Sequence, residues 1–433
     1  MKTVNVTILG STGSIGKQTL SVIDNLNSQK ENTEKEYVVR SLAAKGGDSD
    51  IKAMLEQVKK YGVKKVAFSE PDSAKQFKEM LPDVEVLASM DGIRELAKER
   101  HEKMGGPDEN IVVIAVVGAA GLLPTIDAIK TGHRIALANK ETLVAGGELV
   151  MSKLELNNIM YPPGLRSQGS DLSVFRSEII PVDSEHSAIW QCLAGEDINR
   201  VKRLLLTASG GAFRDLSIER LRHATATDAL EHPTWKMGPK ITIDCATMMN
   251  KGLEIIEAHW LYNMPYEKIT PILHKQSLVH SMVEYVDGSL KAQVGDHNME
   301  IPIQYALTYP DRCAHPSELN FGEPFNLTFE PIDFNNPKYK CLKLAVEAGK
   351  EGGLMPAVMN AANEMAVYAF LDGKIAYLEI PEIIERTMAT YDKTPAKDKK
   401  SGSDPLTVDH ILTADKWARK KAEMIINDLY INY

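Results

Sequence analysis

The first third of the chain alternates short apolar runs with longer segments whose apolar residues recur at helical spacing. This alternation predicts crossover connections between parallel strands, and therefore an α/β fold with a doubly wound sheet of the Rossmann type. Ile111–Val117, a β-branched run that stops at Gly118, is predicted as a central strand. The other predicted strands are Val4–Leu9, Tyr37–Ala43, Lys65–Phe68 and Arg134–Ala138, and the predicted helices are Gly16–Asn25, Ile51–Tyr61, a long segment ending near Arg100, Thr125–Thr131 and Glu141–Leu156.

After Pro181 the pattern becomes less regular, and from Lys340 onward it is helical. We expect an N-terminal nucleotide-binding domain over residues 1–180, a central α+β catalytic domain over 181–309, a connection over 310–339 and a C-terminal helical bundle over 340–433. The polar segments Asn27–Glu36 and Asn158–Ser177 are predicted as surface loops inserted into the first domain, and Lys393–Ser403 as a solvated loop. The helices predicted in the bundle are Pro356–Leu371, Pro381–Tyr391 and Leu406–Asn427.

Charge and cysteine content exclude several classes of protein. The 433 residues include 50 basic and 59 acidic side chains, a net charge of −9, which disfavours a protein that tracks nucleic acid. The longest uncharged apolar stretch, residues 111–124, is too short to span a membrane, and no leader precedes the first strand, so we expect a cytoplasmic protein. Four widely spaced cysteines (Cys192, Cys245, Cys313 and Cys341) fit a reducing compartment and exclude a disulfide scaffold.

A glycine-rich turn, Gly10–Gly16, follows the first strand and opens a helix, as in dinucleotide-binding proteins. Its spacing is GxxGxxG, and a turn that binds no nucleotide is the alternative. The second strand leads into the turn Ala44-Lys45-Gly46-Gly47, and no carboxylate follows until Asp48. A lysine at this place, with Arg40 nearby, favours the 2′-phosphate of NADP over the ribose hydroxyl of NAD, unless Lys45 is only a solvated surface residue.

Two acidic segments suggest a metal site. Asp183 and Glu185 are two residues apart, which in extended backbone places both carboxylates on one face. Oxygen ligands suit Mg²⁺ or Mn²⁺, although such a pair is often only two solvated charges. Downstream, Asn250, Lys251 and Glu254 share one face if they lie on a helix, and an ordinary Lys–Glu helix pair is the alternative there.

Two loops offer groups for an anionic substrate. Thr207–Gly211 ends an apolar strand and presents a hydroxyl and bare backbone N–H groups. Residues 231–239 carry His232 and Trp235 between helix breakers, which predicts a lid in which the histidine donates or accepts a hydrogen bond and the tryptophan excludes water. A packed surface turn is the alternative. His186, His259, His280 and His410 are interpreted as structural residues.

Eight segments, collinear along the chain, resemble motifs of the 1-deoxy-D-xylulose 5-phosphate reductoisomerase family. The combination of DSEH, HPxWxMG and MMNKGLE in this order is far more specific than a Rossmann turn. The segments are GSTGSIG (10–16), ALANKETLV (136–144), PVDSEHSAIWQ (181–191), TASGGAFR (207–214), HPTWKMG (232–238), ATMMNKGLE (246–254), HSMVEYVDGS (280–289) and NAANE (360–364).

The resemblance implies a homodimeric NADPH-dependent oxidoreductase of non-mevalonate isoprenoid biosynthesis, which makes 2-C-methyl-D-erythritol 4-phosphate. A metal-assisted skeletal rearrangement would precede hydride transfer, with Mn²⁺ or Mg²⁺ bound by Asp183, Glu185 and Glu254. Lys140 and His232 would complete the catalytic residues. The implied substrate-binding residues are Lys140, Ser184, Glu185, Ser209, His232, Trp235, Cys245, Asn250, Lys251 and Glu254, and the implied cofactor-binding residues are Thr12, Gly13, Ser14, Ile15, Lys45, Gly46, Gly47, Asn139, Glu141 and Gly238.

Cys245 departs from the family pattern, which usually has serine as a phosphate ligand at this place. Because a thiol is a weak hydrogen-bond donor, we expect weaker phosphate binding than with serine. Two rival interpretations remain open from the residues alone. One is an NADP-linked oxidoreductase that reduces an aldehyde or semialdehyde without a metal, and the other is a nucleotide-sensing or scaffold protein derived from the enzyme.

Overall fold

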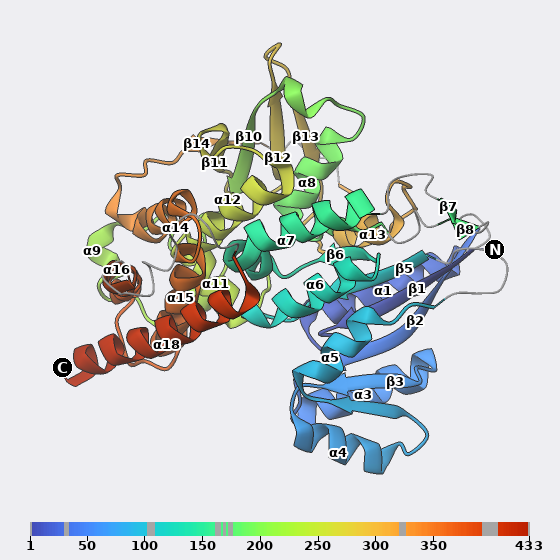
Figure 1. Ribbon diagram of the computed structural model, residues 1–433. Helices are drawn as coiled ribbons and strands as arrows, with labels where there is room; N and C mark the ends of the chain where they lie inside the picture. Colours follow the sequence, from blue (N-terminus) through green and yellow to red (C-terminus); the bar gives the residue numbers. More distant parts are fainter. Residues whose placement is uncertain are drawn as a thin grey trace. The chain divides into compact units, whose positions relative to one another are not determined.

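The computed structural model describes residues 2–29, 34–101, 109–160, 166–167, 170–171, 176–319, 326–391 and 406–431. The chain divides into two compact units (Figure 1). Unit 1 comprises Met1–Thr142, Val150–Ser187 and Asn298–Ser317. Unit 2 comprises Leu143–Leu149, Ala188–His297 and Glu318–Tyr433. The division at residues 180, 309 and 339 that we infer from the sequence stays a prediction.

Unit 1 is built on a seven-stranded parallel sheet in the order β4-β3-β2-β1-β5-β6-β9. From β1 the chain moves outward to β4 and then returns to β5 on the other side of β1, which confirms the doubly wound sheet. Ligands of such sheets bind where the strand order reverses, at the carboxyl ends of the strands. The strands are β1 Lys2–Leu9, β2 Lys35–Ala44, β3 Lys65–Phe68, β4 Glu85–Ala88, β5 Glu109–Ile114, β6 Arg134–Leu137 and β9 Glu178–Pro181.

The helices of unit 1 correct one prediction. The predicted long helix ending near Arg100 is instead two helices separated by β4, a short strand at the sheet edge. Only four residues form β4, and they do not alternate between buried and exposed positions, so the segment carries no strand signal. The helices are α1 Ser14–Ser28, α3 Asp48–Tyr61, α4 Pro71–Met80, α5 Ser89–Lys98, α6 Leu122–Lys130 and α13 Glu300–Thr308, with a 3₁₀ turn, η1, at Gly118–Gly121.

The two predicted inserts are partly regular structure. Asn27 lies in the last turn of α1, where its side chain exchanges two hydrogen bonds with the backbone of Tyr37, at 2.8 and 2.9 Å. These hydrogen bonds stabilise the polar residue Asn27 inside the last turn of the helix. The polarity of the segment alone predicts a loop there. The second insert begins inside α7 (Lys140–Met160), contains β7 (Arg166–Ser167) and β8 (Ser170–Asp171), and otherwise lies mostly outside the described residues.

Unit 2 combines a mixed five-stranded sheet with helices, as expected for an α+β domain. The strand order is β13-β12-β10-β11-β14, and only β10 and β11 pair in parallel. Helix α12 packs on β10 and β11 over an apolar core. The elements are β10 Val201–Ala208, β11 Ile269–Leu273, β12 Val279–Tyr285, β13 Leu290–Val294, β14 Glu330–Pro331, α8 Ser184–Leu193 (whose first turn belongs to unit 1), α9 Ile218–Leu221, α10 Ala226–Leu230, α11 Pro239–Ala246 and α12 Met249–Tyr262, with 3₁₀ turns η3 Ile198–Arg200, η4 Tyr266–Lys268 and η5 Pro337–Tyr339.

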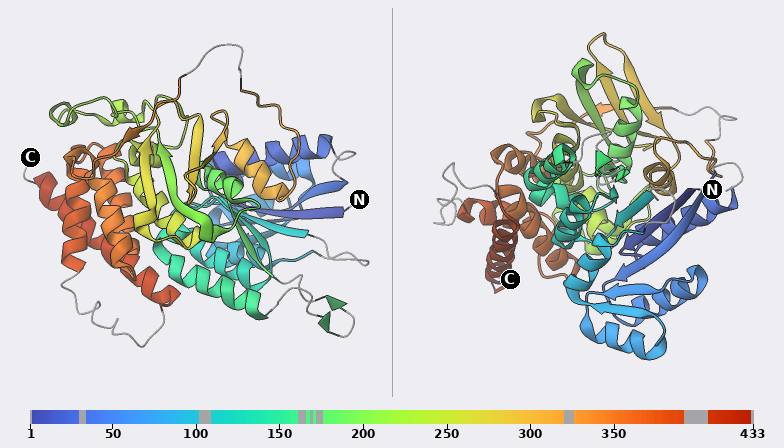
Figure 2. Two further views of the ribbon diagram at one scale, coloured as in Figure 1. Left: turned by 90° about the horizontal axis from the view of Figure 1, so that it is seen from above. Right: turned by 45° about the vertical axis from the view of Figure 1, so that its right-hand side comes forward.

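The C-terminal part of unit 2 is the predicted helical bundle (Figure 2). Helix α15 packs against α11, α14, α16 and α18 and is buried along most of its length, since small alanines let the helices approach. The helices are α14 Lys340–Glu351, α15 Met355–Leu371, α16 Glu379–Tyr391 and α18 Val408–Ile431. The predicted loop Lys393–Ser403 lies entirely outside the described residues. In the described parts of the chain, no helix is long and apolar enough to cross a membrane.

Candidate active site

The glycine-rich turn between β1 and α1 is shaped as a dinucleotide cradle. Gly10 has a φ of +94°, and a Cβ on Gly10 or Gly16 would collide with neighbouring backbone. Gly13 precedes α1, and neither a side-chain cap nor an acidic residue occupies the first turn of that helix. The N–H groups of a helix N-terminus attract anions. Thr12, Gly13, Ser14 and Ile15 therefore fit a pyrophosphate, at the carboxyl end of β1 where the strand order reverses.

Lys45 directly follows β2 at the same edge of the sheet, and its side chain is 82% exposed. Gly46 and Gly47 both have positive φ, and their N–H groups donate to Asp50 and Ser73, each at 2.9 Å. These bonds fix the turn and leave the lysine ammonium facing solvent, 4.0 Å from Glu70. Arg40 is bound elsewhere, since its Nε donates to Asn5 at 2.7 Å. The expectation that Arg40 assists Lys45 is therefore not supported by its contacts.

Asn139 organises the next part of this edge, between β6 and α7. Its Nδ2 donates to the carbonyl oxygens of Val116 and Gly118 at 2.6 and 2.9 Å. Its Oδ1 accepts from the backbone and the hydroxyl of Thr142 at 2.8 and 2.5 Å. The side chain thus caps α7 and holds the loop that follows β5. Glu141, in the same helix turn, is half-buried.

A buried cation and a carboxylate meet where β6 and β9 end side by side. Because these parallel strands are neighbours, Lys140 after β6 and Asp183 after β9 come together, with Nζ 2.5 Å from Oδ2. Ser184 donates to Glu185 at 2.6 Å. The segment is not extended as predicted, since Ser184 and Glu185 begin α8 and Asp183 immediately precedes it. The carboxylates of Asp183 and Glu185 are therefore brought together by the start of α8. The spacing of these residues in the sequence does not reveal that Lys140 lies beside them.

In unit 2, Asn250, Lys251 and Glu254 share one face at the start of α12, as the i,i+3 and i,i+4 spacing predicts. Glu254 is fully buried, so its carboxylate requires partners. Asn250 Nδ2 donates to one oxygen at 2.5 Å, and Lys251 pairs with the other. An oxygen ligand, an amide and an ammonium are thus fixed in one place, a combination that suits a hard cation beside an anion.

Ser209 lies at the carboxyl end of β10 and contacts the predicted lid. His232 Nδ1 accepts the backbone N–H groups of Thr234 and Trp235 at 3.2 and 2.9 Å, so its proton belongs on Nε2. Nε2 lies 2.9 Å from Ser209 Oγ, which also accepts from Gly211 N–H at 3.2 Å. Since a hydroxyl has two acceptor sites and one donor, these bonds leave the Ser209 proton to donate to an anion.

The predicted lid, residues 231–238, connects α10 to α11 and ends at the exposed Gly238. The ring of Trp235 lies edge-on to His297 at 5.5 Å, and His280 is 6.1 Å away. Burial, Arg214 and His297 lower the pKa of His232 to about 4, which keeps its ring neutral near pH 7.

Two residues missed in the sequence analysis support this part of the site. Arg214 donates to the carbonyl oxygens of Ser209 and Lys275, at 3.3 and 2.9 Å, and so fixes the Ser209 turn. His297 donates from Nε2 to the carbonyl oxygen of Gln276 at 2.8 Å while it packs on Trp235. Arg214 belongs to the TASGGAFR motif and could have been found there, whereas His297 stands outside any motif.

The histidines interpreted as structural behave differently from one another. His259 Nδ1 donates to the carbonyl oxygen of Met264 at 2.7 Å, His280 Nε2 donates to that of Asp296 at 3.2 Å, and His186 is buried. The interpretation is wrong for His410, which is exposed at the start of α18.

Comparison with known proteins gives consistent matches along the chain. Residues 6–147 match the family described as 1-deoxy-D-xylulose 5-phosphate reductoisomerase. Residues 179–262 match its C-terminal domain, and residues 294–421 match a second C-terminal domain of the family.

Relatives and solved structures cover nearly the whole chain. The Bacillus cereus (strain Q1) 1-deoxy-D-xylulose 5-phosphate reductoisomerase is 45% identical over 386 residues, 89% of this chain and 92% of the relative. The Pelotomaculum thermopropionicum enzyme is 42% identical over 98% of this chain and 99% of its own. The Zymomonas mobilis enzyme in complex with NADPH superposes with a TM-score of 0.80 at 36% identity, covering 98% of this chain and 99% of its own. A reductoisomerase in complex with NADPH, fosmidomycin and magnesium gives 0.83 at 36% identity, covering 98% of each chain.

Proposed function

The chain belongs to the 1-deoxy-D-xylulose 5-phosphate reductoisomerase family, and we propose from this membership that it makes 2-C-methyl-D-erythritol 4-phosphate. It is an NADPH-dependent enzyme that requires a divalent cation. The geometric observation that supports this most strongly is the Lys140–Asp183 pair at 2.5 Å. The pair places the ammonium of Lys140 beside the acidic segment of Asp183 and Glu185, at the edge of the sheet proposed to bind the nucleotide. A reacting ketose phosphate needs a positive charge and metal ligands at this place.

Asp183, Glu185 and Glu254 are the residues we assign to the cation. All three offer carboxylate oxygens, the ligands that Mg²⁺ and Mn²⁺ prefer. A cation held by them would act as a Lewis acid on the carbonyl and hydroxyl oxygens of the substrate. Lys140, paired with Asp183, would orient the same oxygens with Ser184.

The phosphate group of the substrate is assigned to groups of unit 2. Ser209 offers a hydroxyl proton to the phosphate, because its contacts with His232 and Gly211 use the hydroxyl oxygen as the acceptor. Asn250, Lys251 and Cys245 add an amide, an ammonium and a thiol, and His232 with Trp235 closes the lid. NADPH would bind along the turn of Thr12–Ile15, with Lys45, Gly46 and Gly47 at its 2′-phosphate and Asn139, Glu141 and Gly238 as further contacts, and would supply the hydride.

A homodimer is proposed on the exposed edge of the unit 2 sheet. β13 pairs with β12 on one side, and on its other side no strand of the described residues follows. Leu290 and Val294 on this strand are 55% and 40% exposed. An unpaired edge with apolar side chains is a place where a second chain can add a strand. We also propose a cytoplasmic location, because the four cysteines are widely spaced along the chain, which fits a reducing compartment.

The function is tested by following NADPH oxidation with 1-deoxy-D-xylulose 5-phosphate, with Mn²⁺ or Mg²⁺ and with EDTA. We expect turnover that needs the cation, NADPH in preference to NADH, and 2-C-methyl-D-erythritol 4-phosphate as the product by mass spectrometry. An aldehyde reductase without rearrangement would instead keep its activity in EDTA. Absence of any turnover despite tight NADPH binding would favour a sensing protein.

A further inference from the structure

A buried carboxylate outside the assigned site, Asp244, lies in α11 next to Cys245. It is only 1% exposed, and its neighbours Ile243 and Ala246 belong to the apolar core of the helical bundle. Each carboxylate oxygen has its own partner. Lys240 Nζ lies 2.8 Å from Oδ2, and Asn363 Nδ2 donates to Oδ1 at 2.9 Å. A buried charge is tolerated only with such partners, and here the partners come from two different helices.

A second polar contact holds the end of the same helix. Tyr377 donates from its hydroxyl to the carbonyl oxygen of Ala246, the last residue of α11, at 2.7 Å. The Tyr377 ring packs edge-on against Phe213 at 4.9 Å, just after the Ser209 turn. α11 is therefore fastened to α15 through Asn363 and to the segment before α16 through Tyr377.

The fastened helix end borders the Ser209 turn directly. A Cβ on Gly211, whose φ is +67°, would lie 2.6 Å from the Cα of Ala246. The backbone of the turn and the backbone of α11 are thus in direct contact. Any shift of α11 would displace Gly211, and Ser209 with it, because Gly211 N–H donates to Ser209 Oγ.

The same helix end also sets the start of α12. Met248, which joins the two helices, is buried with a φ of +61°, a left-handed conformation. A residue with a Cβ pays roughly 1–2 kcal/mol for this conformation, which persists only where its surroundings fix it. Since α12 begins at the next residue, the direction of α11 determines where Asn250 and Lys251 lie.

We propose that Asp244 is a positioning residue for the phosphate group of the substrate, acting through its pairs with Lys240 and Asn363. By fixing α11 on α15, it places Ser209, Cys245 and Lys251 around the anion. Lys240 extends the same control to the lid, because α11 begins directly after Gly238. The proposal rests on the proposed function and accounts for the NAANE motif, which has no other part in the site.

The test replaces Asn363 with leucine, which has a similar size and cannot donate to Asp244. Binding of inorganic phosphate is measured by isothermal titration calorimetry, together with KM and kcat. We expect phosphate to bind about tenfold more weakly and the substrate KM to rise about tenfold, while kcat changes by less than about twofold, since a tenfold change corresponds to about 1.4 kcal/mol of binding. Asn363→Gln keeps a polar amide but moves it away from Asp244. This variant should fold, and it should also bind phosphate more weakly and have a higher KM than the wild type.

Two controls separate positioning from a general loss of stability. Arg419→Met removes a 2.6 Å ion pair with Glu364, which lies on the same helix as Asn363 but faces α18. It should lower the melting temperature and leave phosphate binding and KM unchanged. The exchange Asp244→Asn with Asn363→Asp restores the hydrogen bond in the opposite sense and should recover phosphate binding.

The proposal is overturned if Asn363→Leu and Asn363→Gln bind phosphate like the wild type. It is equally overturned if Arg419→Met weakens phosphate binding as much as they do, or if the exchange recovers nothing. Phosphate titration requires no turnover. A wild-type protein that binds phosphate but does not convert the ketose phosphate would therefore count against the proposed function alone.

Discussion

The ring of His232 accepts two backbone N–H groups at Nδ1 and donates from Nε2 to Ser209, so its role requires the neutral tautomer. Burial is the main reason that its pKa falls from 6.5 to about 4, and the positive charges of Arg214 and His297 add to the effect. Because the unfolded chain binds this proton first as the pH falls, the neutral ring stabilises the lid fully above pH 6.5 and progressively less toward pH 4.

We therefore predict that the substrate KM of the wild type rises as the pH falls toward 4, where the His232 ring of the folded protein becomes protonated. Protonation of Nδ1 would remove the acceptor for Thr234 and Trp235 and open the lid. In His232→Asn, an amide oxygen can still accept these N–H groups but does not titrate. Its KM should be higher than the wild-type value at pH 7 and nearly flat with pH. KM measured across the range decides the matter, and parallel profiles for both proteins would refute it.

Cys245 leads to a second prediction for a single residue. It is half-buried at the end of α11, among the groups assigned to the phosphate. A serine hydroxyl donates a hydrogen bond more strongly than a thiol, and one net hydrogen bond is worth about 1 kcal/mol, or roughly fivefold in affinity. Cys245→Ser should lower the substrate KM by about that factor at constant kcat. Cys313→Ser, a substitution outside the assigned groups, serves as the control, and an unchanged or higher KM for Cys245→Ser contradicts the prediction.

Much of the chemistry at the residue scale could be predicted from motifs, but the pairing of side chains could not. The motif predicts that Asp183 and Glu185 belong to the site. That the two carboxylates meet at the start of α8, and not on an extended strand, depends on where β9 ends. The Lys140–Asp183 ion pair joins residues 43 positions apart because β6 and β9 are neighbours, a fact of sheet order that spacing does not contain.

At the scale of elements, the Ser209 turn and α11 must approach through a glycine. Gly211→Ala would meet the α11 backbone at 2.6 Å and also adopt a φ of +67°. Gly195 has a similar φ of +79° but open space around it, so Gly195→Ala isolates the conformational cost. We predict that Gly195→Ala lowers the free energy of unfolding by about 1 kcal/mol, and that Gly211→Ala lowers it by roughly 3 kcal/mol or more.

Urea unfolding of both variants measures the difference. Gly211→Ala should also raise the substrate KM, since it displaces Ser209, whereas Gly195→Ala should leave KM unchanged. Equal destabilisation by the two substitutions would mean that the turn and α11 separate easily.

Long periodic segments were the elements that could be predicted reliably. α15 and α16 begin within two residues of the predicted starts, because each carries a long apolar pattern of its own. β4 was missed because an edge strand of four residues depends on its neighbour β3 for pairing, not on its own sequence. Asn27 was misplaced for a similar reason, since its contact with Tyr37 ties a helix end to the next strand.

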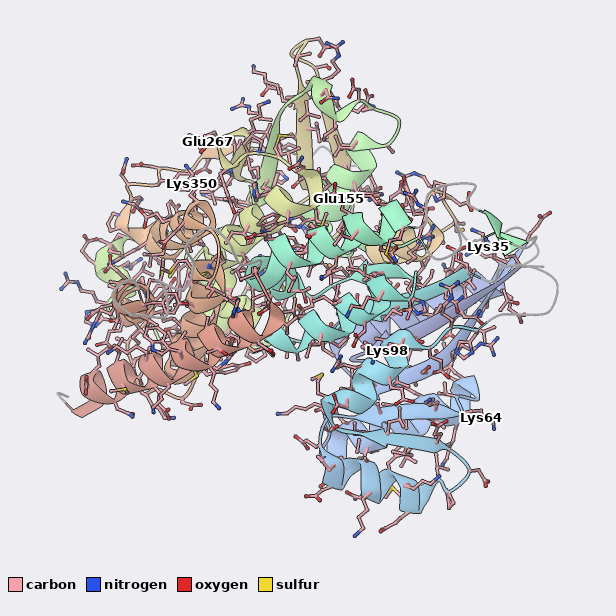
Figure 3. The ribbon with its side chains drawn as sticks, in the orientation of Figure 1. Lys35, Lys64, Lys98, Glu155, Glu267 and Lys350 are labelled. Atoms are coloured by element: carbon pink, nitrogen blue, oxygen red, sulfur yellow. The ribbon has the colours of Figure 1, made fainter. Side chains whose placement is uncertain are left out.

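For the whole molecule, the net charge of −9 does not oppose an anionic substrate. Surface charges such as those of Lys64, Lys98, Glu155, Glu267 and Lys350 are spread over the molecule (Figure 3). Solvent screens exposed pairs of this kind, as at Glu267 and Lys350, 3.2 Å apart. The lysines of the assigned site, Lys140 and Lys251, are buried and so act in a lower dielectric. Local fields in each unit, not the sum of charges, therefore decide which ligand binds.

The edge of the unit 2 sheet provides the last prediction, which concerns assembly. If a second chain covers β13, then Leu290→Lys with Val294→Lys places two charges in the contact and should shift the protein from dimer to monomer, because burying unpaired charges is costly. Met424 is 53% exposed on α18, so Met424→Lys is a matched control that should leave the dimer intact. Light scattering after size-exclusion chromatography gives the masses. If the double variant is still a dimer, the interface does not include β13. If the wild type is a monomer, the proposal of a homodimer is wrong.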